Sequence, residues 1–390
     1  MNICFFAHHS ISGKDGASLS MLSIAENLAS EGNNIYIIYP NHPQNVSHHK
    51  GIKNLYLRNF SMRRSLDDSS IVSSCIYQIK DIYNNLLALY IAKKMKKYKI
   101  DIIHINGIDN CIGAQYALYN RIPYVWHIRQ FLEEDLHCTP FNKRKMYRYM
   151  ARASQIIGIS KAVCEKYKRI LKRDIQLIYN GVEPEKYILP THAFGSEPYT
   201  MILPGRITKE KGQFDAVKAL CILIKKGIEI ELLLVGYGVD DYCLQIKRYV
   251  KENHIEKYVK FIDYTDDLRQ LRKAADIGLV CSIKEAFGRV TIENFFGKLL
   301  CIGANAGGTA ELIKDGYNGI LYKSGDYKDL AEKIETIIHE DEKKNYTDMI
   351  ERAYQEAMEK YTTNRLIKEI KQIYSLSLQK NDNTEADKKW

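Results

Sequence analysis

Short apolar runs alternate along the whole chain with segments of helical periodicity. Five runs rich in Ile, Tyr and Val occupy the first half: Asn2–Ala7, Asn34–Tyr39, Asp101–Asn106, Tyr124–Ile128 and Gln155–Ile159. Six more follow in the second half: Thr200–Leu203, Glu229–Val235, Val259–Asp263, Asp276–Ser282, Leu299–Gly303 and Gly319–Tyr322. Runs of about four to eight residues bounded by turn formers predict buried strands.

The segments between these runs carry helical signals. In Ala17–Ser30 the apolar residues recur at helical spacing, and Gly32 ends the pattern. Strands that alternate with helices imply parallel sheets with helices on both faces. The pattern therefore predicts an α/β protein.

At 390 residues the chain is longer than one hydrophobic core usually serves, so two domains are expected. Turn formers gather between Asn180 and Pro198, which predicts an interdomain linker over residues 180–198. The domains then span residues 1–179 and 199–361. A long polar helical stretch, Lys328–Leu378, closes the chain, and we expect residues 380–390 to form a disordered tail.

Composition narrows the cellular setting. No uninterrupted apolar stretch approaches twenty residues, so no membrane-spanning helix is expected. The apolar run Met1–His8 contains none of the basic residues with which a signal peptide begins, so no signal peptide is expected. The nine cysteines are scattered and form no C-x-x-C pair, which argues against a zinc or redox site. A cytoplasmic protein is expected, without cofactor or metal.

The formal net charge of +10 is unevenly placed. Residues 50–100 hold eleven Lys and Arg against three Asp and Glu, and residues 141–173 hold eleven against one. Such clusters bind nucleic acid, anionic lipid or phosphorylated substrates, or are simply solvated faces. In the first cluster, apolar residues at helical spacing precede four lysines: Ile76, Ile79, Ile82, Tyr83, Leu86, Leu87, Leu89 and Tyr90, then Lys93, Lys94, Lys96 and Lys97.

That arrangement is typical of an amphipathic helix lying on a membrane. The chain contains none of the sequence motifs of nucleic-acid-binding proteins. We therefore predict an anionic membrane surface as a partner, on the inner face of the plasma membrane, and no nucleic acid.

Two glutamates eight positions apart give the best indication of chemistry. Glu285-Ala-Phe-Gly-Arg-Val-Thr-Ile-Glu293 lies where the apolar run Asp276–Ser282 gives way to a helix. Gly288 directly before that helix lets backbone N–H groups and the positive helix end approach a phosphate, while the two carboxylates flank it. By itself, this spacing also occurs by chance.

Further motifs occur in a fixed order around the two glutamates. Upstream are Leu203-Pro-Gly-Arg-Ile-Thr-Lys-Glu-Lys211-Gly212 and Leu234-Val-Gly-Tyr-Gly238; downstream are Gly307-Gly308-Thr-Ala-Glu311 and Asn318-Gly319-Ile-Leu321. In this order the motifs resemble those of the retaining family 4 glycosyltransferases. The resemblance implies the GT-B fold: two Rossmann-like domains facing each other across a cleft, with a last helix, about residues 362–379, that crosses back onto the first domain. It also implies metal-independent transfer of a sugar from a nucleotide diphosphate sugar.

The resemblance assigns roles in the second half. Glu285 is expected to hold the hydroxyls of the donor sugar, and Glu293 those of the ribose. Arg206 and Lys211 follow the first strand of the second domain, where fixed cations can stabilise a leaving diphosphate. Backbone donors to the diphosphate come from Phe287, Gly288, Arg289 and Val290.

Each of these residues can also be interpreted as an ordinary surface residue without a functional role. Arg206, Lys211 and Arg289 are solvated cations in the alternative interpretation, and Glu293 a helix-surface glutamate. No D-x-D occurs in the chain, so a metal-dependent glycosyltransferase route lacks its usual ligands.

Two assignments fall in the first half. His127 occupies the position of the family's first-domain histidine, which faces the donor sugar, although a histidine at a strand end is more often structural. The family usually has an acidic residue close behind, whereas here Ile128 and Arg129 follow. The segment Ser12–Ser18 resembles the family's glycine-rich loop. Gly16 and the backbone N–H groups that follow it can contact the distal phosphate of the donor.

The predicted function is a retaining, metal-independent glycosyltransferase. It uses a UDP- or GDP-linked sugar and a lipid-linked or oligosaccharide acceptor in bacterial surface polysaccharide biosynthesis (capsule, O-antigen or lipopolysaccharide). A nucleotide-sugar epimerase or a phosphorylase on the same scaffold is an alternative, because fold does not fix function. A non-enzymatic two-lobed sugar-binding protein would need export. A dinucleotide oxidoreductase is disfavoured, since no G-x-G-x-x-G follows Asn2–Ala7.

Overall fold

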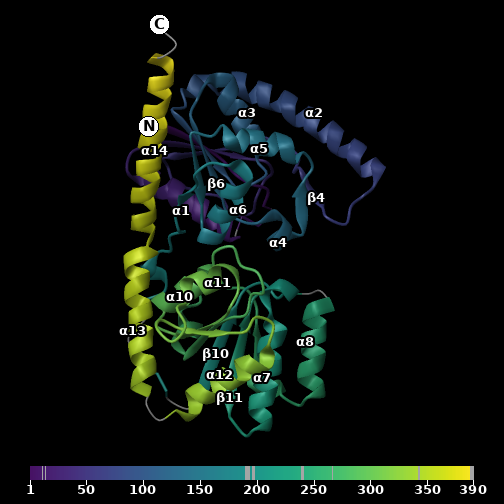
Figure 1. The fold of residues 1–390 in the computed structure, drawn as a ribbon, viewed down its shortest axis with the longest axis vertical. Coiled ribbons are helices and arrows are strands. Elements are labelled where there is room, and N and C mark those ends of the chain that lie inside the picture. The colour runs from purple at the N-terminus through teal and green to yellow at the C-terminus, as the bar shows by residue number, and fades with distance from the viewer. Residues whose placement is uncertain are drawn as a thin grey trace. The chain divides into compact units, whose positions relative to one another are not determined.

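The computed structural model divides the chain into two compact units (Figure 1). Unit 1 comprises residues 1–181 and the segment that starts at Thr363, and unit 2 runs from Val182 to Thr362. The structure describes residues 1–10, 12–13, 15–188, 194–195, 198–238, 241–265, 267–340 and 343–386. Part of the predicted linker, residues 189–193 and 196–197, therefore lies outside the described residues.

Unit 1 is built on a parallel seven-stranded sheet of order β3-β2-β1-β5-β6-β8-β9. Its strands are β1 (Asn2–Phe6), β2 (Asn34–Tyr39), β3 (Ile52–Tyr56), β5 (Ile102–Asn106), β6 (Tyr124–Ile128), β8 (Gln155–Gly158) and β9 (Gln176–Leu177). The strand order runs outward in both directions from β1 and β5, so the two form the switch point of a doubly wound sheet. A separate antiparallel ribbon joins β4 (Arg63–Ser65) to β7 (Cys138–Pro140).

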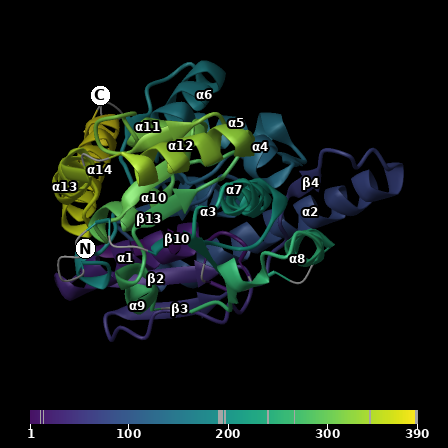
Figure 2. The ribbon, with the colours of Figure 1, turned by 90° about the horizontal axis from the view of Figure 1, so that it is seen from below.

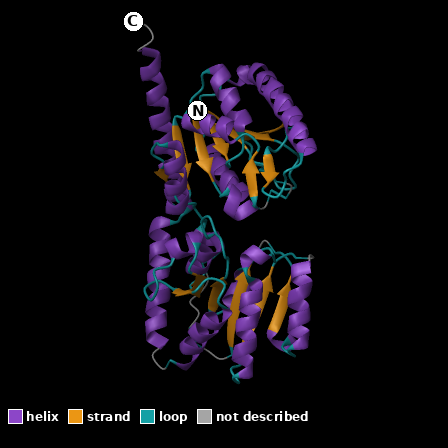
Figure 3. Ribbon diagram, turned by 45° about the vertical axis from the view of Figure 1, so that its right-hand side comes forward, coloured by secondary structure: helices purple, strands orange, loops and turns teal. Residues whose placement is uncertain are grey.

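Helices cover both faces of this sheet (Figure 3). They are α1 (Gly16–Ser30), α2 (Ile71–Lys94), α3 (Cys111–Asn120), α4 (Leu132–Leu136), α5 (Lys143–Ala151), α6 (Lys161–Leu171) and α14 (Thr363–Ala386), with the short 3₁₀ helix η1 (Met95–Tyr98). The apolar face of α1 packs in one core with strands β1 and β2 and with residues of α14 such as Leu366 and Ile370. The assigned helix α14 extends to Ala386, and residues 387–390 lie outside the described part. The predicted disordered tail, residues 380–390, stays a prediction.

Unit 2 has a parallel six-stranded sheet of order β12-β11-β10-β13-β14-β15. Its strands are β10 (Tyr199–Pro204), β11 (Ile230–Val235), β12 (Val259–Ile262), β13 (Ile277–Val280), β14 (Leu300–Ala304) and β15 (Ile320–Tyr322). Here β10 and β13 are the neighbours from which the order runs outward. The predicted α/β class with parallel sheets is confirmed in both units.

The helices of unit 2 bury their apolar faces on this sheet. They are α7 (Gln213–Lys225), α8 (Asp241–Glu252), α9 (Arg269–Lys273), α10 (Arg289–Phe296), α11 (Gly307–Leu312), α12 (Tyr327–His339) and α13 (Lys343–Lys360), with short 3₁₀ helices η2 (Pro184–Lys186), η3 (Lys209–Lys211) and η4 (Glu256–Tyr258). The predicted helical stretch Lys328–Leu378 thus falls into α12, α13 and α14. Among the described helices, none is both long enough and apolar enough to cross a membrane.

Candidate functional site

The loop that follows β10 is held against the end of β13 by a glycine. Gly212 has φ +67°, and a Cβ at this position would lie 2.1 Å from the backbone oxygen of Cys281. Only glycine fits such an approach without displacing backbone. Gln213 closes the same loop by donating to the backbone oxygen of Arg206 over 2.8 Å. The sequence therefore fixes η3, which precedes Gly212, beside the end of β13.

This contact brings together two of the predicted residues. The Nζ of Lys211 lies 2.7 Å from an Oε of Glu285, although 74 positions separate them in sequence. The side chains of Lys211 and Glu285 are 37% and 19% exposed, so both are half-buried and reachable from solvent. The ion pair lies beyond the carboxyl ends of the neighbouring strands β10 and β13, at the switch point of the unit 2 sheet.

A second glycine turn supports the loop of Glu285. A Cβ on Gly307 would lie 2.4 Å from the backbone oxygen of Glu285, and one on Gly308 would lie 2.3 Å from that of Phe287. The backbone N–H of Gly308 donates to the Glu285 oxygen over 2.6 Å. The backbone of Gly307 and Gly308 thus packs directly against the backbone of Glu285 and Phe287. This contact fixes the position of the Glu285 backbone, from which its side chain extends. Gly288 ends this loop and directly precedes α10.

Glu293 lies inside a buried network of unit 2. One carboxylate oxygen accepts from Arg272 over 2.9 Å; the other accepts from Arg289 over 2.9 Å and from the Tyr187 hydroxyl over 3.0 Å. Burial alone raises the pKa of Glu293, but Arg272 and Arg289 outweigh burial and hold the pKa below its ordinary value. Both oxygens are already engaged, so a ribose at Glu293 has to share or displace a protein partner.

The remaining second-half residues have varied surroundings. Arg206 is exposed, and its side chain makes no hydrogen bond or ion pair with the described residues. Arg289 turns toward Glu293 and not toward solvent, and Val290 is half-buried in the first turn of α10. Their predicted roles at a diphosphate stay predictions.

His127 is a fully buried residue of β6. Its Nδ1 lies 3.1 Å from Nε2 of His104, whose Nδ1 lies 2.7 Å from the hydroxyl of Tyr374 in α14. Burial, together with the nearby Arg129 guanidinium, lowers the pKa of both histidines well below its ordinary value, so both are neutral. The Nε2 of His127 is buried without a hydrogen-bond partner among the described residues. This is the setting of a core histidine, and the predicted role toward the donor stays a prediction.

Sequence reasoning gave Arg129 no role, yet it is the centre of a polar network in unit 1. The buried guanidinium donates to Asn106 over 2.9 Å and to Ser20 over 2.8 Å, and it also contacts Asn180. Burial lowers the pKa of Arg129 to about 9. Asn106 continues the network to His8 over 3.1 Å.

His8 in turn reaches the loop of the predicted Gly16. It lies 3.0 Å from Asp15, which caps α1 by accepting from the backbone of Ser18 over 3.0 Å. Gly16 begins α1, and a Cβ added there would meet nothing within 4 Å. No packing contact therefore requires glycine at this position, which leaves its predicted role at a phosphate open. Lys14 of the same loop lies outside the described residues.

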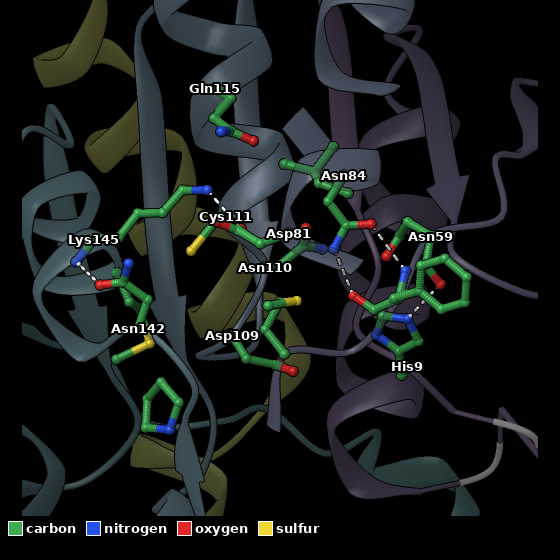
Figure 4. Close-up of a pocket in the computed structure, with 15 residues that line it drawn as sticks. His9, Asn59, Asp81, Asn84, Asp109, Asn110, Cys111, Gln115, Asn142 and Lys145 are labelled. Atoms are coloured by element: carbon green, nitrogen blue, oxygen red, sulfur yellow. Dashed lines mark hydrogen bonds and ion pairs between the residues drawn. The ribbon is translucent and has the colours of Figure 1, made fainter. Parts of the chain in front are cut away.

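A small polar pocket elsewhere in unit 1 is lined in part by Asp81 and Asn84 of α2 (Figure 4). Its wall includes Asp109, whose carboxylate pairs with the guanidinium of Arg63 at 2.8 and 3.0 Å. His9 lies 3.1 Å from the backbone oxygen of Asn59. These contacts join separate segments of unit 1 around the pocket. None of its residues was predicted from sequence.

Both halves of the chain are similar to known protein families. A family model described as Glycosyltransferase Family 4 matches residues 14–186, and one described as Glycosyl transferases group 1 matches residues 187–356. N-acetyl-alpha-D-glucosaminyl L-malate synthase of Bacillus anthracis is 26% identical over 306 residues, 75% of this chain and 79% of the relative. The capsular polysaccharide biosynthesis glycosyltransferase CapM of Staphylococcus aureus is 25% identical over 169 residues, 42% of this chain and 44% of CapM.

Among solved structures, that of Anabaena Alr3699/HepE in complex with UDP and glucose has a TM-score of 0.74 at 20% identity, and the match covers 96% of this chain and 99% of that one. The two parallel-sheet units and these matches define an enzyme, a glycosyltransferase with the GT-B fold. The chain belongs to glycosyltransferase family 4, the group 1 glycosyl transferases. The predicted family and enzyme class are confirmed.

Proposed function

We propose that this glycosyltransferase moves a sugar from a UDP- or GDP-linked donor to a lipid-linked or oligosaccharide acceptor in bacterial surface polysaccharide biosynthesis. The observation that carries the donor side is the Lys211–Glu285 pair, 2.7 Å apart beyond the ends of β10 and β13. Open α/β sheets bind ligands at this switch point. The relationship to CapM supports the polysaccharide setting.

In the resting protein the ion pair keeps each side chain turned toward the other. A half-exposed pair of this kind stabilises the fold by little, on the order of 0–1 kcal/mol, so a ligand can open it cheaply. With donor bound, the Lys211 ammonium turns its hydrogens to the diphosphate, and the Glu285 carboxylate accepts from hydroxyls of the sugar. Two hydroxyls on one carboxylate fix the sugar's orientation, which lowers the entropic part of the barrier.

The leaving diphosphate gathers negative charge as the glycosidic bond breaks. Lys211 and the exposed Arg206 supply positive charge to it, and the backbone N–H groups from Phe287 to Val290 supply donors at the start of α10. The acceptor hydroxyl forms its bond to the anomeric carbon on the same face from which the phosphate oxygen leaves, and its proton passes to the leaving diphosphate. Configuration is then retained, as the family resemblance implies.

The donor is tested by thermal unfolding with a panel of nucleotide sugars. A ligand that binds only the folded protein, at 100 times its dissociation constant, stabilises it by about 2.7 kcal/mol. We expect one base and sugar combination to raise the unfolding temperature of the wild type, and to raise it less in Lys211→Ala. If no UDP- or GDP-linked sugar stabilises the wild type, the proposed donor class is wrong.

We also expect transfer to continue in excess EDTA. Lys211 and Arg206 can take the place of a metal at the diphosphate, and the described residues hold no group of three or more His, Cys, Asp or Glu side chains placed to bind one. The measurement is nucleoside diphosphate release with and without EDTA. Loss of activity in EDTA that Mg²⁺ or Mn²⁺ restores would contradict metal-independent transfer.

A further inference from the structure

Helix α2 turns its large apolar side chains to solvent. Nine large apolar residues of α2 are each at least 42% exposed. Ile71, Val72 and Tyr90 lie near its ends, and the other six form its outer stripe: Ile76, Ile79, Ile82, Tyr83, Leu86 and Leu89. At 3.6 residues per turn they fall within an arc of about 140°. Figures 1 and 2 both show α2 at the periphery of unit 1. A helix on the surface of a water-soluble domain normally presents polar residues there.

The opposite face explains why the stripe cannot turn inward. Asn84 is buried and exchanges hydrogen bonds with the backbone of Phe60 at 3.0 and 2.8 Å. Asp81 and Asn85 both accept from Lys145 of α5, over 2.6 and 2.7 Å. Figure 4 shows Asp81, Asn84 and Lys145 around the polar pocket. The polar face of α2 thus packs against unit 1, whereas most surface helices turn their polar face to solvent.

Charge is arranged in one direction along α2. No exposed residue from Ile71 to Tyr90 is charged, and the last turn and η1 then bring the exposed Lys93, Lys94, Lys96 and Lys97. No Asp or Glu occurs between Asp81 and Asp101 to neutralise them. An apolar stripe that ends in uncompensated lysines is complementary to a surface with an apolar interior and an anionic boundary.

We infer that α2 docks on an anionic lipid surface, with its outer stripe among the upper acyl chains and its lysines at the lipid phosphates. Its 24 residues span about 36 Å, enough to lie in the interface plane as an amphipathic helix. The inference adds to the proposed function the surface at which a lipid-linked acceptor is met. It does not depend on the donor, because α2 belongs to unit 1 and Lys211 and Glu285 to unit 2.

Vesicle sedimentation without any nucleotide sugar tests the docking. We expect the full-length protein to pellet with phosphatidylglycerol vesicles at low ionic strength and far less with phosphatidylcholine vesicles, and we expect the binding to phosphatidylglycerol to fall as salt rises. Replacing Lys93, Lys94, Lys96 and Lys97 by Gln should lower the partition coefficient on phosphatidylglycerol about 10-fold or more. The matched control, Lys247, Lys251, Lys273 and Lys328 to Gln, removes the same charge from exposed lysines of unit 2 and should bind as the wild type.

The apolar part is tested by the pair Ile79→Gln and Leu86→Gln, with Leu244→Gln and Leu376→Gln as the control at other exposed positions. The first pair should weaken binding and the second should not, while circular dichroism shows all variants folded. Equal binding to both lipids, or to neither, overturns the inference. So does a dimer in analytical ultracentrifugation that Ile79→Gln and Leu86→Gln dissociate, since a second copy then covers the stripe. Failure here leaves nucleotide-sugar turnover unaffected, and so separates this inference from the proposed function.

Discussion

Replacing Lys211 or Glu285 by alanine is expected to lower turnover by about 10²-fold or more while the protein stays folded. Lys211 acts on charge that develops in the transition state and Glu285 on the orientation of the sugar, and losing such a group costs about 2–4 kcal/mol of transition-state stabilisation. The two side chains contact each other at 2.7 Å, so the double variant should lose less than the product of the single losses. Rates of nucleoside diphosphate release measure all three.

Lys209→Ala is the matched control for this prediction. Lys209 belongs to the same 3₁₀ helix as Lys211 and is exposed, but it lies outside the ion pair. It should retain nearly wild-type turnover. Near-normal rates in both Lys211→Ala and Glu285→Ala would show that the reaction is carried out elsewhere in the molecule.

Glu293→Ala is expected to act first on stability, with a loss of about 3–5 kcal/mol in the free energy of unfolding. The side chain of Arg272 is only 1% exposed, and removing the carboxylate leaves its charge buried without a counter-ion. Arg289 and the Tyr187 hydroxyl lose an acceptor as well. Denaturant unfolding measures the change, and Glu293→Gln should lie between the wild type and Glu293→Ala.

Glu285→Ala serves as the comparison, because it removes a carboxylate that is half-exposed and should change the free energy of unfolding by no more than about 1 kcal/mol. The two glutamates of one motif are thus separated, one by its effect on turnover and the other by its effect on the fold. If Glu293→Ala unfolds like the wild type but no longer binds nucleotide, Glu293 belongs to the ligand site and the network is secondary.

The strands that could be predicted from the sequence are those made largely of apolar residues, which indicate a buried strand by themselves. β10 and β11 are nearly continuous apolar runs, and their parallel pairing follows from the helix between them. β3 was missed because Ile-Lys-Asn-Leu-Tyr is partly exposed, and β4, β7 and β9 because two or three residues carry no periodicity. Such short strands are set by their partners in the fold and not by local pattern.

The candidate site was partly accessible from the sequence for a similar reason. Lys211 and Glu285 each follow a predicted strand, but that they meet depends on β10 and β13 being neighbours in the sheet. The partners of Glu293 could not be foreseen, because Arg272 and Tyr187 come from unrelated elements.

The apolar stripe of α2 was visible in the sequence, but its direction was not. Ordinary amphipathic helices bury such a stripe, and only the polar anchors at Asn84 and Asp81 show that this one faces outward. Buried polar contacts between distant segments are the feature that a single sequence conveys least.

The central claim is that donor chemistry takes place at the Lys211–Glu285 pair. Its most direct measurement is nucleoside diphosphate release from the stabilising nucleotide sugar, followed side by side for the wild type, Lys211→Ala and Lys209→Ala. We predict turnover in the wild type and in Lys209→Ala, and a rate about 10²-fold lower in Lys211→Ala. Equal rates in all three proteins, or no release by the wild type from any UDP- or GDP-linked sugar, would contradict it.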